Sequence, residues 1–247
     1  MNEIMISNKE DIARLVNEWG FLPFFVGEVR GFSLAEVTPS KLWFPEDDTS
    51  DNGVWDWKSD IILEADCAYG KLYSGRACFV SMDCFPDLVN CRRASVKLTT
   101  QERRILDVLK ANHSLLSGEL KKLCGYVKPR VPHSANRISR IAEKQAGHPA
   151  RRIQTGEKKK VEGFETALTH LQMGGFVVSA AFEYKYDREG KRYGWGMARY
   201  ATPEDFFGPE RLRVNHSPEE SYDRLMRAIV RIPLSFTPGQ ARRLILG

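Results

Sequence analysis

The stretch FETALTHLQMGGFVV, residues 164–178, decides which fold we expect for this chain. Its first part predicts a helix with one apolar face, because four apolar residues follow the spacing i, i+3, i+4, i+7: Phe164, Ala167, Leu168 and Leu171. A pair of glycines then ends the helix, and the apolar residues beyond them predict a strand. This pattern fits either the recognition helix of a winged helix-turn-helix or an ordinary helix lying on a sheet.

Two segments upstream predict further helices. Residues 98–113, LTTQERRILDVLKANH, begin with a capping box of Thr99 and Glu102 and continue with an apolar stripe. Residues 114–125, SLLSGELKKLCG, predict a shorter helix that ends at a glycine. With the helix that begins at residue 164, these segments form a series of three helices.

Two strand-like runs follow the glycine pair, at residues 176–186 and 191–202. The linker DREG between them contains Gly190, which accepts the positive φ that a tight hairpin turn needs. Three helices followed by a hairpin is the order of a winged helix. We therefore expect an α+β fold with a winged helix-turn-helix.

One feature departs from this pattern. Residues 126–163 separate the second and third helices, which a helix-turn-helix joins by about three or four residues. Residues 121–160 hold twelve lysines and arginines against two acidic residues, whereas residues 1–100 hold ten against sixteen. This asymmetry favours a polyanionic partner for the insertion, although a solvated loop would have the same composition.

The sequence divides into three predicted regions: an N-terminal α/β unit at 1–97, a winged-helix domain at 98–208 with the insertion at 126–163, and a helical tail at 209–247. In the N-terminal unit, an amphipathic helix is followed by a hairpin that turns at YSGR and carries Tyr69 and Phe79 in its arms. Trp55 and Trp57 are two positions apart. They would share one face of a strand.

Composition narrows the functional classes. No apolar run reaches the roughly 18–20 residues that cross a bilayer, and the first residues carry acids where a signal peptide has a basic cluster, so we expect a cytoplasmic protein without membrane contact. The five cysteines include no C-x-x-C pair and lie near no histidine at ligand spacing, which indicates reduced thiols rather than a metal site. No phosphate-binding loop or dinucleotide fingerprint occurs, so no cofactor is expected.

Three motifs carry a resemblance to a known family: CAYGK at 67–71, LTHLQM at 168–173 and YATPEDFFG at 200–208. Over roughly residues 20 to 210, the chain resembles bacterial winged-helix proteins described as related to AlkZ, which are more distantly similar to DNA glycosylases that excise alkylated or crosslinked bases. The resemblance implies a role in DNA repair. Those glycosylases depend on a Gln-x-Gln or Gln-x-Asp pair, and none of the five glutamines here has Gln or Asp two positions later. No catalytic residue therefore carries over.

The predicted partner is nucleic acid, most simply double-stranded DNA, and the predicted contacts fall in three groups. The insertion contributes Arg137, Arg140, Arg151, Arg152, Lys158, Lys159 and Lys160. The exposed face of the third helix contributes Thr166, Thr169 and His170. The hairpin tip contributes Lys185, Arg188, Lys191 and Arg192. We expect the insertion and the hairpin tip to lie on one side of the molecule.

Two alternatives to DNA binding alone stay open. The first is a base-excision enzyme with a rearranged site, and it would use Asp56 or Glu64 from the acidic residues near the tryptophans. The second is a protein-interaction module that presents the third helix to another protein.

Overall fold

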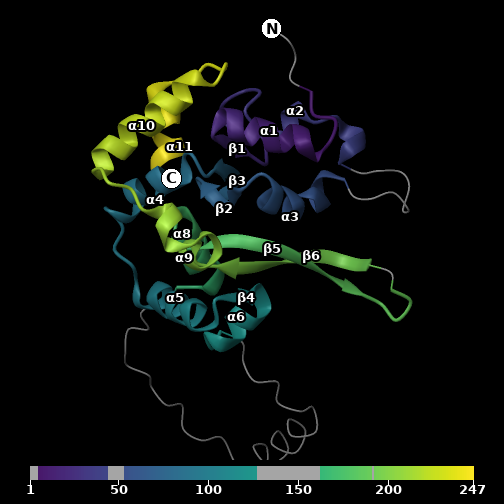
Figure 1. The fold of residues 1–247 in the computed structure, drawn as a ribbon. Coiled ribbons are helices and arrows are strands. Elements are labelled where there is room, and N and C mark those ends of the chain that lie inside the picture. Colours follow the sequence, from purple (N-terminus) through teal and green to yellow (C-terminus); the bar gives the residue numbers. More distant parts are fainter. Residues whose placement is uncertain (1–4, 44–52, 127–161, 191) are drawn as a thin grey trace, which may run out of the picture.

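The computed structural model describes residues 5–43, 53–126, 162–190 and 192–247. It has an α+β architecture, in which helices surround two small antiparallel sheets (Figure 1). The α+β prediction is thereby confirmed. Residues 127–161 and Lys191 lie outside the described part of the chain.

The first sheet lies in the N-terminal region and has the strand order β1-β3-β2. Its strands are β1 (Phe21–Pro23), β2 (Cys67–Tyr73) and β3 (Arg76–Ser81). The predicted hairpin is confirmed, because β2 and β3 pair antiparallel with Tyr69 opposite Phe79. Ser74 and Gly75 at its tip both have positive φ, as tight hairpin turns require.

The helices of the same region are α1 (Lys9–Trp19), α2 (Leu34–Val37), α3 (Val54–Glu64) and α4 (Phe85–Arg93), with a 3-10 turn η1 (Ser40–Leu42). The amphipathic pattern of α1 is confirmed, because its buried residues are those at the helical spacing: Ile12, Leu15, Val16 and Trp19. Asn8 caps its first turn, and Gly20 ends it in the left-handed conformation.

The strand predicted around Trp55 and Trp57 is wrong. Both residues lie on α3, where a two-residue spacing places side chains on different sides of a helix. The alternation of apolar and polar residues in this segment imitated a strand. In the helix, Val54, Ile61 and Ile62 are buried instead.

The second sheet has the strand order β4-β6-β5, with antiparallel pairing throughout. Its strands are β4 (Ser114–Leu116), β5 (Val178–Tyr186) and β6 (Arg192–Ala201). Three helices accompany it: α5 (Thr100–Asn112), α6 (Ser117–Leu123) and α8 (Phe164–Met173). The three predicted helices and the hairpin are confirmed, as is the capping box at the start of α5. The short strand β4 was not predicted.

The C-terminal region is helical, with α9 (Pro203–Phe207), a 3-10 turn η2 (Pro209–Leu212), α10 (Pro218–Arg231) and α11 (Pro238–Leu246). The predicted start of α10 is confirmed, because Ser217 and Glu220 form a capping box ahead of Pro218. Both α10 and α11 contact α4, and Figure 1 shows them at the same end of the molecule.

Arg92 ties the C-terminal helix to the rest of the fold. Its guanidinium is 2% exposed and donates hydrogen bonds to the carbonyl oxygens of Leu72, Met173, Leu244 and Ile245 at 2.6–2.9 Å. These acceptors lie in β2, at the end of α8 and in α11. One buried cation therefore joins three segments that are far apart in the sequence.

Two hydrophobic clusters lie on either side of the start of β5. The larger is formed by the N-terminal region together with α10 and α11, and it includes Val178. The smaller is formed by α5, α6 and α8, and it includes Val177. Adjacent residues of an extended chain point to opposite sides, so this strand connects the two cores. Among the described helices, none combines the length and apolar character needed to cross a membrane.

Candidate nucleic-acid interface

The two ends of the basic insertion meet beside the start of α8. The ring of Tyr126, the first residue of the insertion, lies 5.4 Å from the ring of Phe164, the first residue of α8. An ion pair of 3.0 Å between Lys121 of α6 and Glu165 of α8 also connects the two helices at this point. The chain therefore leaves and re-enters the described fold at one point, between α6 and α8.

The face of α8 that we predicted to be open is partly covered. Thr166 is exposed, as expected. Thr169 is half-buried, because its hydroxyl accepts a hydrogen bond of 3.0 Å from the Lys71 amine and donates one of 2.7 Å to the Glu165 carbonyl. Next along the helix, the buried Gln172 accepts a hydrogen bond from the Lys71 backbone amide at 3.0 Å. The β2–β3 hairpin thus packs against the part of α8 that carries Thr169.

His170 lies among carboxylates. Its Nδ1 is 3.0 Å from Glu162 and 3.3 Å from Glu102, and the three side chains offer ligand atoms within 4.8 Å of one another. The other oxygen of Glu102 accepts the Thr99 backbone amide in the capping box. Contacts of the imidazole with two carboxylates and a helix cap account for this cluster. Its negative charge disfavours a phosphate at His170.

The cations of the β5–β6 hairpin divide into two kinds. Lys185 and Arg188 are exposed near its tip, as predicted for groups that contact phosphates. Arg192 instead turns back toward the N-terminal region, where its guanidinium lies 2.8 Å from the Asp56 carboxylate and 4.1 Å from the centre of the Tyr184 ring. The Tyr184 hydroxyl donates to the same carboxylate at 2.7 Å. Burial and the Asp56 carboxylate raise the pKa of Tyr184, so its hydroxyl stays protonated.

The remaining predicted contacts lie outside the described residues. They are Arg137, Arg140, Arg151, Arg152, Lys158, Lys159, Lys160 and Lys191. The predicted position of the insertion relative to the hairpin tip stays a prediction for the same reason.

The two carboxylates of α3 proposed for catalysis, Asp56 and Glu64, do not form a pair. Asp56 is held by Tyr184 and Arg192, as described above. Glu64 binds the Lys9 amine at 2.6 Å, and it lies at the other end of α3 from Asp56. General acid and base catalysis needs two groups that face one reacting centre, and each of these carboxylates is engaged by a different cation.

Sequence reasoning missed an aromatic cluster where α3 contacts β5. Figure 1 shows α3 beside the β5–β6 hairpin. The Lys58 amine sits among the rings of Phe182, Trp55 and Phe24, at 4.3, 4.9 and 5.6 Å from their centres. Burial lowers the pKa of Lys58 to about 8, although the negative charge of Asp56 acts to raise it. The spacing of Trp55 and Lys58, three positions apart, would have indicated one helical face if the segment had been assigned to a helix.

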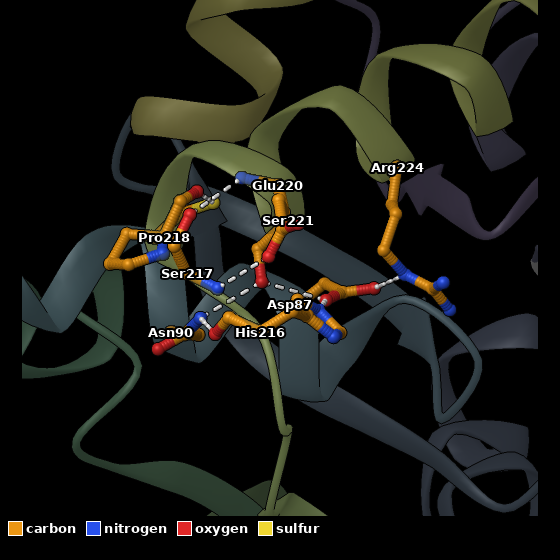
Figure 2. Close-up of polar contacts among 9 residues, drawn as sticks. Asp87, Asn90, His216, Ser217, Pro218, Glu220, Ser221 and Arg224 are labelled. Atoms are coloured by element: carbon orange, nitrogen blue, oxygen red, sulfur yellow. Dashed lines mark hydrogen bonds and ion pairs between the residues drawn. The ribbon is translucent and has the colours of Figure 1, made fainter.

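A second polar cluster, centred on Asp87 of α4, also escaped prediction (Figure 2). The Asp87 carboxylate is 4% exposed and accepts hydrogen bonds from His216 Nε2 at 2.5 Å, Ser221 Oγ at 2.8 Å and Arg224 Nε at 2.9 Å. Both Ser221 and His216 bind the carboxylate rather than one another, so the arrangement is not a nucleophilic triad. The three donors to Asp87 all come from the C-terminal region, so the cluster holds α10 against α4.

The described residues form an α+β protein with two linked cores and an exposed hairpin that carries cations near its tip. A family model described as AlkZ related matches residues 6–245, which is nearly the whole chain. The chain therefore belongs to the AlkZ-related family, as the sequence motifs predicted. This membership indicates a protein related to DNA repair and similar to glycosylases. No match was found among curated proteins or among solved structures.

Proposed function

We propose that this protein is a winged-helix protein that binds double-stranded DNA, mainly through the phosphates, in a repair setting. The observation that carries the proposal is the ring contact of Tyr126 and Phe164, which joins both ends of the basic insertion beside α8. In a winged helix, this is the region that faces DNA. Residues 121–160, which hold twelve cations, belong to the segment that leaves and re-enters the described fold there.

The order of elements supports the winged-helix interpretation. Helix α5, strand β4, helices α6 and α8, and the β5–β6 hairpin follow one another, and β4 pairs with β6. In this interpretation α8 is the recognition helix and the hairpin is the wing. The insertion is an expanded turn of the helix-turn-helix.

The contacts of α8 favour recognition of phosphates over recognition of bases. Thr169 is engaged by Lys71, and His170 is paired with Glu102 and Glu162, so two of three predicted base-contacting residues already have partners. Thr166 alone offers little discrimination, because strong base reading uses bidentate side chains such as Arg or Asn. Affinity would therefore come from Lys185, Arg188 and the insertion.

The test is the salt dependence of duplex binding, measured by fluorescence anisotropy between 50 and 200 mM salt. If six cations meet phosphates, log K falls by about five for each tenfold rise in salt. A double variant, Lys185→Gln with Arg188→Gln, should make that slope shallower by about two. A variant in which the seven insertion cations proposed as contacts are replaced by glutamine should reduce the slope most.

A matched control uses two exposed arginines of the C-terminal region, Arg213→Gln with Arg231→Gln, which removes the same charge elsewhere. This control should keep the slope of the unchanged protein. The proposal fails if the full chain shows no binding to duplex DNA at 50 mM salt, or if the control loses as much affinity as the variant with Lys185→Gln and Arg188→Gln.

Family membership favours a second candidate, a base-excision enzyme with a non-standard site. Asp56 is the better of the two carboxylates for this role, because it lies beside the aromatic cluster, whereas Glu64 is paired with Lys9 and half exposed. Incubation with alkylated duplex DNA should then release bases and leave abasic sites. Asp56→Asn should abolish the release and Glu64→Gln should not. Turnover that is unchanged in both variants would exclude these carboxylates.

The third possibility, a protein-interaction module that presents α8, is less well supported. The β2–β3 hairpin already covers the part of α8 that carries Thr169. A pull-down that survives nuclease treatment and fails with Thr166→Glu, on the exposed part of the helix, would favour it over DNA binding.

A further inference from the structure

The Lys58 amine has an environment unlike that of the other described lysines. It projects from α3 into the space between Trp55 of the same helix, Phe24 of the N-terminal region and Phe182 of β5. Three aromatic rings replace the water that surrounds an ordinary surface amine. Such desolvation disfavours the charged form and leaves the nitrogen lone pair free for a larger share of the time.

Two donors in this cage have no acceptor among the described residues. Lys58 makes neither a hydrogen bond nor an ion pair there, although Asp56 is close enough to affect its charge. The indole Nε1 of Trp55 is buried and also lacks a hydrogen-bond partner within the described chain. Buried donors are nearly always satisfied in folded proteins. The buried Trp55 indole therefore calls for an oxygen acceptor, whereas the half-buried Lys58 amine can also bind water.

The cage reaches the surface through Trp55. The ring of Trp55 contacts Phe25 and Trp195, with ring centres 5.8 and 6.2 Å apart. Phe25 is 44% exposed and Trp195 is 81% exposed. Lys58 itself is only half-buried, so part of its side chain is open to solvent. Exposed aromatic rings beside such an amine can also stack on nucleobases.

From this geometry we propose that Lys58 is a nucleophile that forms an imine with an aldehyde, and that the aldehyde is the ring-opened sugar of an abasic site in DNA. A lysine amine in an apolar pocket reacts with carbonyl groups in this way. The nitrogen lone pair attacks the aldehyde carbon, and the carbonyl electrons move to the oxygen. The oxygen takes up a proton that the nitrogen gives up, and loss of water then leaves the imine. No oxidant or reductant is needed.

The surroundings of Lys58 suit each stage of this reaction. The Trp55 indole offers a donor that can bind a sugar oxygen. Asp56 carries a negative charge that would stabilise the protonated imine, and Tyr184 and Arg192 hold that carboxylate in place. The choice of an abasic sugar rests on the proposed function, because only a DNA-binding protein would meet it. The reactivity of the amine does not depend on DNA.

The first experiment therefore tests the amine without DNA. The full chain is treated with limiting glyceraldehyde and sodium cyanoborohydride, which reduces imines to stable amines, and modified lysines are located by peptide mass spectrometry. At pH 7.5 an amine with a pKa of about 8 is neutral on the order of 100 times more often than an ordinary lysine. Lys58 should be labelled at least tenfold faster than the exposed Lys122 of α6, with a pH midpoint near 8.

The second experiment uses a duplex oligonucleotide with one abasic site and sodium borohydride. A covalent protein–DNA product should form with the unchanged protein and with Lys122→Met, but not with Lys58→Met. Lys58→Arg keeps the cation among the rings and removes the nucleophile, so it should also give no product. Its melting temperature shows whether the cage still folds, which separates lost chemistry from lost structure.

The outcomes are distinguishable. Equal labelling of Lys58 and Lys122 by glyceraldehyde would overturn the proposal, whatever the protein does with DNA. Fast labelling of Lys58 without trapping of abasic DNA, in a protein that binds intact duplex, would overturn the assignment of the aldehyde to DNA. Fast labelling in a protein that binds no duplex would instead remove the proposed function. Trapping that persists in Lys58→Met would assign the imine to another amine and refute the role of Lys58.

Discussion

Replacement of Asp87 by alanine tests how the C-terminal region is attached. The substitution removes the acceptor of three side-chain donors, His216, Ser221 and Arg224, which lie about 130 positions later in the chain. Asp87 is 4% exposed and Ser221 is fully buried, so water cannot replace the lost acceptor without rearrangement. We expect α10 to loosen from α4.

The size of the effect follows from burial. Breaking a buried charged pair by removing one partner costs about 3–5 kcal/mol. The lower end applies here, because the Arg224 side chain is 55% exposed and that of His216 is 23% exposed, so solvent screens part of the interaction. A loss of about 3 kcal/mol lowers the melting temperature of a chain of this size by about 6–12 °C.

The effect also has a defined pH dependence. Burial alone would raise the pKa of Asp87, but the hydrogen bonds from His216, Ser221 and Arg224 outweigh it and lower the pKa below the ordinary value. A carboxylate with a lowered pKa in the folded state contributes stability above its unfolded pKa of about 3.9, and that stability is lost as the pH falls through the folded value. The difference between the unchanged protein and Asp87→Asn should therefore be fully present at pH 7 and begin to shrink only below about pH 4.

The assay is thermal and urea unfolding at several pH values, with hydrogen exchange of α10 as a local measure. Asp83→Ala is the matched control, because Asp83 is an exposed carboxylate four positions earlier. The control should unfold like the unchanged protein. If Asp87→Ala is no less stable than Asp83→Ala, or if its deficit is the same at pH 3 and pH 7, the carboxylate does not fasten α10 and our account of the cluster is wrong.

Two further predictions concern other close contacts. A Cβ added at Gly196 would lie 2.8 Å from the Tyr184 ring, whose hydroxyl is fixed on Asp56, so Gly196→Ala should cost about 1–3 kcal/mol in urea unfolding. Gly118→Ala, which points into open space, should cost nothing, and equal stability of the two variants would contradict the clash. Arg92→Met should destabilise the protein by on the order of 3 kcal/mol and speed amide exchange in α11, because four carbonyl oxygens lose their buried donor. Unchanged exchange in α11, relative to the exposed control Arg242→Met, would refute that role.

Local features of this protein were predictable because their causes act within a few residues. The apolar spacing from Phe164 to Leu171 predicts α8, since residues three and four apart share a helix face. The capping box of Thr99 and Glu102 marks the start of α5 for a similar reason. Gly190 marks the turn of the β5–β6 hairpin, where its φ is positive.

The same local reasoning failed where two structures share one pattern. Trp55 and Trp57 alternate with polar residues, as in a strand, yet they lie on a helix. The short pattern could not separate the two possibilities. Contact of α3 with α1, β2 and β5 decides in favour of the helix.

The functional surfaces depend on segments that lie far apart in the sequence. Lys58 becomes a desolvated amine only because Phe182, more than 120 positions later, packs over it, and Arg192 leaves the hairpin surface only because Asp56 of α3 lies beside it. The sequence alone predicted most of the helices, several of their caps and the two hairpin turns, because backbone hydrogen bonds and side-chain periodicity are short-range effects. Only the tertiary structure decided which charges are paired, which are desolvated and which face solvent, because burial is a property of the segments that meet in the folded chain.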